Sequence, residues 1–161
     1  AITCPNFTKG FGDVRNFMVV ADEGRDGKYK CQEIRTQLII VDITEETNPI
    51  PVATFKVPDG DFCERGGRFG THQFAETKDG NIIGGTLIYT AYFDAGLRIV
   101  DIADPFKPKE VGYYIPDTTE KTKPRLKTVI QTNDVDLDYR GLIYITDRAG
   151  TGMHILKYTG K

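Results

Sequence analysis

The sequence contains no serine and no tryptophan, and only two of its 161 residues are histidines and three are cysteines. Without serine, every mechanism that uses a serine nucleophile is excluded. Because His72 and His154 are the only histidines, this chain cannot by itself form a zinc site with three histidine ligands. No apolar run approaches the roughly 18 residues that are needed to cross a bilayer, so we expect no membrane insertion.

An excess of charge of one sign is also missing. The 21 Lys and Arg residues balance 23 Asp and Glu residues, which gives a formal net charge of −2. A nucleic-acid interface requires basic side chains that neutralise phosphates, so we expect no nucleic-acid partner. With 39% hydrophobic residues, the chain can bury the core of one domain over residues 1–161. The start of the sequence shows no signal peptide, so any targeting segment has been removed or lies outside it.

An internal repeat organises the sequence. Residues 38–43 read LIIVDI and residues 97–102 read LRIVDI, at an offset of 59. A third copy follows, because residues 141–156 resemble residues 85–100 at an offset of 56. Fixed-period similarity of this kind is the signature of a repeat architecture. We place the three units at residues 17–58, 71–117 and 128–158.

The units have the composition of strands and turns. Short runs rich in Val, Ile, Tyr and Phe alternate with Gly, Asp, Asn and Pro, and no helical period is sustained. The run 97–102 is apolar on both faces, which is typical of a strand between two sheets. Four such runs per unit predict an all-β chain made of four-stranded antiparallel β-propeller blades. A β-sandwich is the alternative, although a sandwich has no reason to repeat in sequence.

The stretch Gly96–Pro105, followed by Lys107-Pro108, resembles the signature of LVIVD-repeat proteins. The resemblance extends over most of residues 17–158. It implies propeller blades that open with a strand of the His-Asp-Val type, which reads Thr71–Phe74 and Thr132–Val135 in this sequence. It also implies an exported, extracytoplasmic protein of bacteria or archaea, in a family whose members mostly have no assigned role.

The expected ring of blades is incomplete, because closed propellers contain about 4 to 8 blades. No opening strand is evident before Phe17, and the last unit stops after its third strand. We therefore expect partial blades, exposed sheet faces and a partner that completes the ring. The partner is either the remaining blades of a longer propeller, of which this is a C-terminal portion, or another chain.

Two of the three cysteines lie in inserted loops. Cys31 lies in the loop 23–36 of the first unit, and Cys63 lies in the loop 59–70 before the second. In an exported protein we expect a Cys31–Cys63 disulfide, worth roughly 3–4 kcal/mol through loop closure, with Cys4 free or paired outside this chain. Three reduced thiols are the alternative, and the spacing does not match a zinc motif.

The loop that leads into the second unit is rich in charged and aromatic side chains. The first strand of a propeller blade lines the central channel, so we expect a ligand-binding rim here with His72 pointing into the channel. Arginine pairs suit a carboxylate or phosphate group, because the guanidinium fork binds such anions bidentately. The alternative is structural: the arginines anchor the loop and His72 hydrogen-bonds a neighbouring blade. The candidate ligand-binding residues are Glu64, Arg65, Arg68, His72, Gln73, Asn133 and Arg148.

His72 is also the candidate metal ligand, since neutral imidazole is the commonest protein ligand of transition metals. Asp61, Glu64 and Glu76 can add oxygen ligands, and further histidines would have to come from blades outside this chain. No other cofactor is predicted. The aspartates at 134, 136 and 138 resemble the start of an EF-hand loop, but Tyr139 replaces its glycine, so we expect a strand and turn instead.

Two functions remain open, and with them the question whether the chain is an enzyme. The first is a non-catalytic exported binding module whose rim recognises a small anion, a glycan or a protein, because no complete catalytic constellation is present. The second is a metal-dependent oxidase or hydrolase, with a channel-centred site around His72 that other blades complete. A purely structural cell-surface repeat is a third class. We favour the first.

Overall fold

The computed structural model describes residues 2–7, 15–23, 36–58, 60–76, 85–123 and 128–160, and of residues 2–7 it describes the backbone alone. Within these ranges the chain is all-β, and no helix is long and apolar enough to span a membrane. The strands are β1 (Ile2–Phe7), β2 (Arg15–Ala21), β3 (Leu38–Asp42), β4 (Ile50–Phe55), β5 (Phe69–Phe74), β6 (Leu87–Phe93), β7 (Leu97–Asp101), β8 (Lys109–Tyr114), β9 (Thr132–Leu137), β10 (Leu142–Asp147) and β11 (Met153–Lys157).

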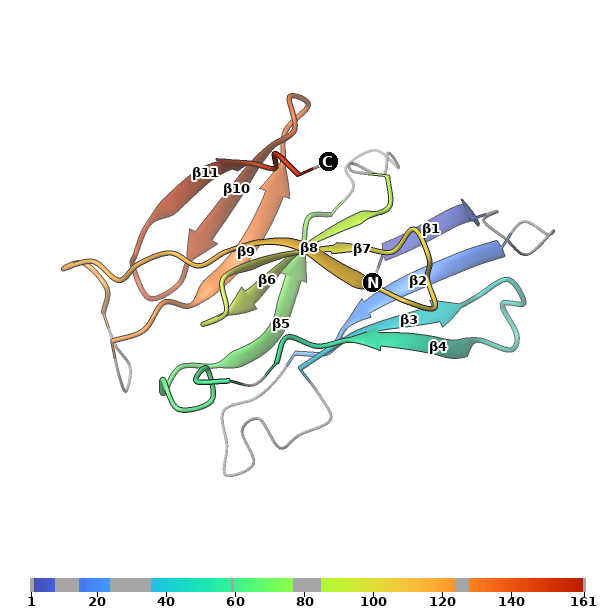
Figure 1. The fold of residues 1–161 in the computed structure, drawn as a ribbon, viewed down its shortest axis with the longest axis horizontal. Coiled ribbons are helices and arrows are strands. Elements are labelled where there is room, and N and C mark those ends of the chain that lie inside the picture. The colour runs from blue at the N-terminus through green and yellow to red at the C-terminus, as the bar shows by residue number, and fades with distance from the viewer. Residues whose placement is uncertain are drawn as a thin grey trace.

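The strands form antiparallel sheets in which neighbours along the chain are neighbours in space (Figure 1). The first sheet is β1–β4, the second is β5–β8 and the third is β9–β11. A single pair, Phe93 with Thr132, links β6 to β9 and joins the second and third sheets into one curled sheet. Antiparallel meanders that follow one another in this way are propeller blades, so the predicted fold class is confirmed.

The first sheet corrects one expectation, because an opening strand does precede Phe17. β1 pairs with β2 through Ile2 with Val19, Thr3 with Met18 and Cys4 with Phe17. The segment ITCPNF lacks an apolar alternation and contains a proline, which is why it does not look like a strand. At a sheet edge, however, a strand pairs on one side only, and the register shift between Cys4 and Phe7 accommodates Pro5.

The first and second sheets pack face to face. Their contact is a core of aliphatic and aromatic side chains that alternate along the strands, as expected for strands with one face buried. The second sheet turns its other face to the third sheet in the same way. The first core contains Phe17, Val19, Leu38, Ile40, Phe74, Ile88, Val100 and Ile102, and the second contains Tyr89, Ala91, Leu97, Ile99, Val135, Leu137, Ile143 and Ile145.

The aspartate of the repeated motif ends its strand. Asp42 Oδ1 accepts a hydrogen bond of 2.9 Å from Thr44 N, and Asp101 Oδ1 accepts one of 2.8 Å from Ala103 N. An aspartate that binds the amide two residues ahead replaces the ladder partner and turns the chain. The same residue therefore closes the third strand of both the first and the second sheet.

The hairpin between β9 and β10 is built on Asp138. Its Oδ1 accepts hydrogen bonds from Arg140 N at 2.9 Å and Leu142 N at 3.0 Å, and its Oδ2 accepts one from Tyr144 Oη at 3.0 Å. Desolvation raises the pKa of this carboxyl, but these bonds and the one from Arg140 Nε outweigh it and hold the pKa at about 2. The carboxylate of Asp138 thus binds groups of the turn itself. This agrees with the strand and turn that the sequence analysis expects here in place of a calcium-binding loop.

We predict that Ile40→Ala destabilises the protein by about 2–5 kcal/mol, because Ile40 is 0% exposed between the first two sheets and its removal leaves a cavity. Urea unfolding measures the change. Ile50→Ala is the matched control: Ile50 is 51% exposed, so its loss should alter the free energy of unfolding by no more than about 0.5 kcal/mol. Equal effects of the two substitutions would contradict the packing described.

We predict that Asp138→Asn lowers the free energy of unfolding at neutral pH and that the deficit disappears in acid. A carboxyl whose folded pKa lies below its unfolded value of 3.8 stabilises the fold above pH 3.8. That contribution is lost as the pH falls through about 2. Urea unfolding of both proteins at a series of pH values should show curves that converge in this window, and a constant difference would refute the role of the carboxylate.

Candidate functional site

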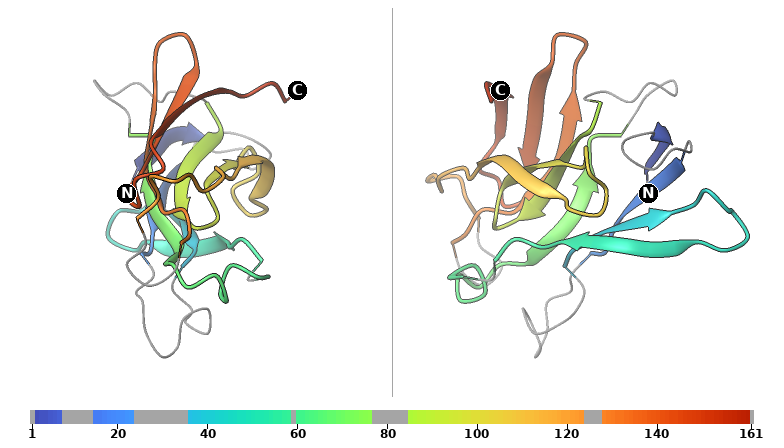
Figure 2. Two further views of the ribbon diagram at one scale, coloured as in Figure 1. Left: turned by 90° about the vertical axis from the view of Figure 1, so that its left-hand side faces the viewer. Right: turned by 45° about the vertical axis from the view of Figure 1, so that its right-hand side comes forward.

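β5 lies where the three sheets meet. Thr71 in β5 forms a parallel bridge with Glu23, which follows β2, and its hydroxyl donates to Asp22 O at 3.0 Å. On the other side, His72 Nδ1 lies 2.6 Å from Asn133 O in β9. β5 therefore lies at a junction of all three sheets, and its ribbon runs between the other strands in both views of Figure 2. We call the residues gathered here the rim cluster: Glu23, Arg68, His72, Phe93, Asn133 and Arg148.

Phe93 is the platform of the rim cluster. Its ring is buried at the end of β6, and the guanidinium carbons of Arg68 and Arg148 lie 4.5 Å and 5.4 Å from the ring centroid. The imidazole of His72 lies 5.0 Å from the same ring. Cations over an aromatic face are attracted by the ring quadrupole, so one phenyl ring holds two arginines together in spite of their like charge.

The rim cluster has more positive than negative charge. Arg68 Nη2 pairs with Glu23 Oε1 at 2.5 Å, and His72 Nε2 lies 4.0 Å from the same oxygen. Arg148 is exposed, and its guanidinium has no carboxylate partner in the part of the chain that the structure describes. When the imidazole of His72 is neutral, the two arginines and the one glutamate give the rim cluster a net charge of +1. The exposed guanidinium of Arg148 carries one of the two positive charges.

His72 is oriented by its contact with the third sheet. A backbone carbonyl can only accept, so Nδ1 carries the hydrogen that is donated to Asn133 O. In the neutral ring Nε2 then has its lone pair available, and it is this nitrogen that faces Glu23. The structure thus places His72 in the inter-blade hydrogen bond that was the structural alternative, and it leaves Nε2 for a further partner. The Oδ1 atom of Asn133 is buried without a donor among the described residues.

Gln131 fixes the backbone beneath both arginines. Its side chain accepts from Arg68 N at 2.9 Å and donates to Arg68 O at 3.3 Å, and its own carbonyl accepts from Arg148 N at 3.0 Å. Gly67 makes this possible, because a Cβ at that position would lie 2.3 Å from Gln131 Nε2. Gln131 therefore holds the backbones of the two arginines next to each other.

Three of the predicted site residues lie outside the rim cluster. Arg65 pairs with Asp61 in its own loop, with Nη2–Oδ2 at 2.9 Å, and stacks on Phe62 at 4.5 Å. Gln73 points to the other side of β5 and donates to Glu76 Oε1 at 3.0 Å. Glu64 is exposed on the loop. Arg68, His72, Asn133 and Arg148 are the predicted residues that the structure brings together.

The sequence analysis missed Glu23 and Phe93. The sequence does contain a signal for Glu23. Asp22-Glu23 follows the end of β2, and Asp147-Arg148 stands at the end of β10. Glu23 and Arg148 therefore occupy equivalent positions in two of the units. A comparison of the three turns would have shown an acidic and a basic side chain at the same rim. Phe93 could not be distinguished from other apolar residues at strand ends.

The described residues include no group of three His, Cys, Asp or Glu side chains that could hold a metal ion. At His72, Glu23 is the carboxylate within 4.0 Å of Nε2. A metal at His72 would therefore need donors beyond the described residues, and this site stays a prediction.

Cys63 is disulfide-bonded, which excludes the alternative of three reduced thiols. Cys31 and the side chain of Cys4 lie outside the described residues, so the pairing of Cys31 with Cys63 remains a prediction. A stapled loop would hold the segment that leads into Arg68 and β5.

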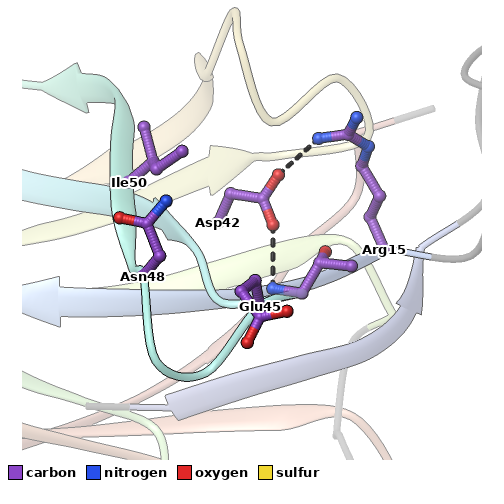
Figure 3. Close-up of a pocket in the computed structure, with 6 residues that line it drawn as sticks. Arg15, Asp42, Glu45, Asn48 and Ile50 are labelled. Carbon is purple, nitrogen blue, oxygen red and sulfur yellow. Dashed lines mark hydrogen bonds and ion pairs between the residues drawn. The ribbon is translucent and has the colours of Figure 1, made fainter.

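A polar pocket of about 240 Å³ opens at the β3–β4 turn of the first sheet, away from the rim cluster (Figure 3). Its main contact is the ion pair between Arg15 Nη1 and Asp42 Oδ2 at 2.6 Å. Burial raises the pKa of Asp42, but hydrogen bonds from Thr44 and the pairing with Arg15 bring it below the ordinary value. Because Glu45 also lines it beside the Arg15–Asp42 pair, the pocket has a net charge of −1, opposite in sign to that of the rim cluster.

Comparison with known families identifies one repeat. Residues 82–116, which include β6, β7 and β8, match the model of the LVIVD repeat. No curated protein matches the chain.

We predict that a non-reducing peptide map contains a fragment in which Cys31 is linked to Cys63, because the sequence places both cysteines in insertions into the repeat. Mass spectrometry before and after reduction identifies the pair. A fragment that links Cys4 to Cys63 would contradict the assignment. Cys31→Ser should then lower the free energy of unfolding by about 3 kcal/mol through the lost loop closure.

Proposed function

We propose that this LVIVD-repeat protein is an exported, non-catalytic β-propeller module that binds an anionic ligand at the rim cluster. The β-propeller-type repeat rests on the fold and on the family match. The binding role rests chiefly on Arg148, an exposed guanidinium held beside Arg68 on the face of Phe93 without a carboxylate partner in the described chain.

The chemistry of the rim cluster suits a carboxylate or a phosphate. A guanidinium presents a planar fork of donors that fits two oxygens of such a group, and charge-assisted bonds of this kind are about twice as strong as neutral ones. Arg148 supplies this fork. Arg68, already paired with Glu23, adds positive potential, and protonated His72 would add a donor at Nε2. The ligand is therefore a small anion, or a glycan or protein that carries an acidic group.

Export is supported by the cysteines. A disulfide at Cys63 persists in an oxidising compartment and is rare in the cytosol. A propeller whose rim is stapled by such a bond keeps its ligand-binding loop in place outside the cytoplasm. The enzyme alternative receives no comparable support, because the described chain contributes one histidine and one nearby carboxylate to the site around His72.

We predict that Arg148→Ala weakens binding of phosphate and succinate at least about 10-fold, because one charge-assisted contact is lost. Arg148→Lys should recover only part of the affinity, since an ammonium group cannot bind bidentately. Isothermal titration calorimetry at low ionic strength measures both.

Lys109→Ala is the control, because Lys109 is exposed in β8 and its loss removes the same charge away from the rim cluster. Equal weakening by Lys109→Ala would show that net charge alone attracts the anions. Absence of binding at roughly 10 mM, or unchanged affinity in Arg148→Ala, would refute the proposed site.

A further inference from the structure

We propose that the pocket at the β3–β4 turn is a second binding site and that it takes an ammonium group carried on an alkyl chain. Figure 3 shows Asn48 and Ile50 on one side of Asp42, and Arg15 on the other. The pocket combines acidic, amide and apolar side chains around one opening of about 240 Å³. Its lining residues are Arg15, Asp42, Thr44, Glu45, Asn48 and Ile50.

Glu45 carries the uncompensated charge of the pocket. Arg15 and Asp42 neutralise each other through the contact of 2.6 Å between Nη1 and Oδ2. The carboxylate of Glu45 has no cationic partner in the part of the chain that the structure describes. Thr47 Oγ1 donates to its Oε1 at 2.6 Å, which helps to orient it. The negative charge that faces a ligand is therefore that of Glu45, and its sign selects a cation.

The turn that carries the pocket is repeated in the second sheet. The turn of the first sheet has a hydrogen bond of 2.9 Å from Asn48 N to Glu45 O, and that of the second sheet has one of 2.9 Å from Lys107 N to Asp104 O. Each turn also begins with the aspartate that ends the third strand. The two backbones are thus held by the same bonds, whatever side chains line them.

The side chains of the pocket are not repeated with the turn. The strand registers align the two turns position by position. Because the second turn forms without them, the lining side chains of the first turn are not required to build it. Side-chain differences in a loop on a shared scaffold are typical of a local binding role. The replacements in the second sheet are Gly85 for Arg15, Ala103 for Thr44, Lys107 for Asn48 and Lys109 for Ile50.

An alkylammonium group matches the lining of the pocket. Its three N–H donors can be accepted by the Glu45 carboxylate and by the amide oxygen of Asn48. The side chain of Ile50 is 51% exposed and offers an apolar wall to the alkyl chain. A divalent cation is a poorer match. Calcium takes about 6 to 8 oxygen ligands, and the described residues contain no group of three His, Cys, Asp or Glu side chains that could hold a metal ion.

The test is an NMR titration of the nitrogen-15-labelled protein with n-butylammonium chloride. We expect saturable shifts of the amide signals of residues 42–50. Glu45→Gln should weaken binding at least about 10-fold, because a charge-assisted contact is lost. Glu46→Gln is the matched control: Glu46 is exposed in the same turn but does not line the pocket, so the affinity should change by less than about 2-fold. The spectra also report whether each variant is folded.

Two further titrations define the ligand. Ile50→Ala should weaken binding of butylammonium about 3-fold and leave that of methylammonium unchanged, because methylammonium has no alkyl chain to contact the wall. Nα-acetyl-lysine amide presents the ammonium group of a protein side chain: affinity equal to that of butylammonium assigns the pocket to a lysine of a partner, and weaker binding assigns it to a free amine. Absence of saturable shifts up to about 50 mM butylammonium, or equal affinities of Glu45→Gln and Glu46→Gln, would overturn the proposal.

Discussion

Burial of the second sheet between its two neighbours is the contact on which the rest of the structure depends. Both of its faces are apolar, and each apolar face removed from water contributes about 25 cal/mol per Å² of buried area. Ile88 and Val100 belong to one core, and Tyr89 and Ile99 belong to the other. The second sheet is therefore the middle layer of the stack, and the positions of the first and third sheets follow from their contact with it.

The rim cluster is a consequence of this stacking. Its residues come from the end of β2, from β5 and the loop before it, from the end of β6, from β9 and from the turn after β10. None of these segments would place Arg68 and Arg148 on the ring of Phe93 by itself. Gln131 then fixes the backbones of both arginines. The geometry of the rim cluster and the stability of the stack are thus coupled, because loss of sheet packing separates the charges.

The repeats are alike where they pack and differ where they meet solvent. Apolar residue pairs at equivalent register positions of the second and third strands recur in all three units. An aspartate ends the third strand of the first two units. At the rim, in contrast, Glu23 and Arg148 occupy equivalent turns with opposite charge. Such a division is expected of a scaffold whose fold is set by a common core and whose recognition depends on the loops.

Much of the fold could be predicted from the sequence, because the alternation of apolar residues and the repeat spacing report local strand geometry and sheet-to-sheet packing directly. β1 was missed, since an edge strand pairs on one side and tolerates the proline of ITCPNF. The site was predicted in part: Arg68, His72, Asn133 and Arg148 come together, whereas Arg65 and Gln73 find local partners. The sequence by itself determined the strands, the turns and the apolar faces. Only the tertiary structure decided which charges meet, because a contact between Glu23 and Arg68 or between Phe93 and Arg148 depends on how whole sheets stack, and no local pattern records that distance.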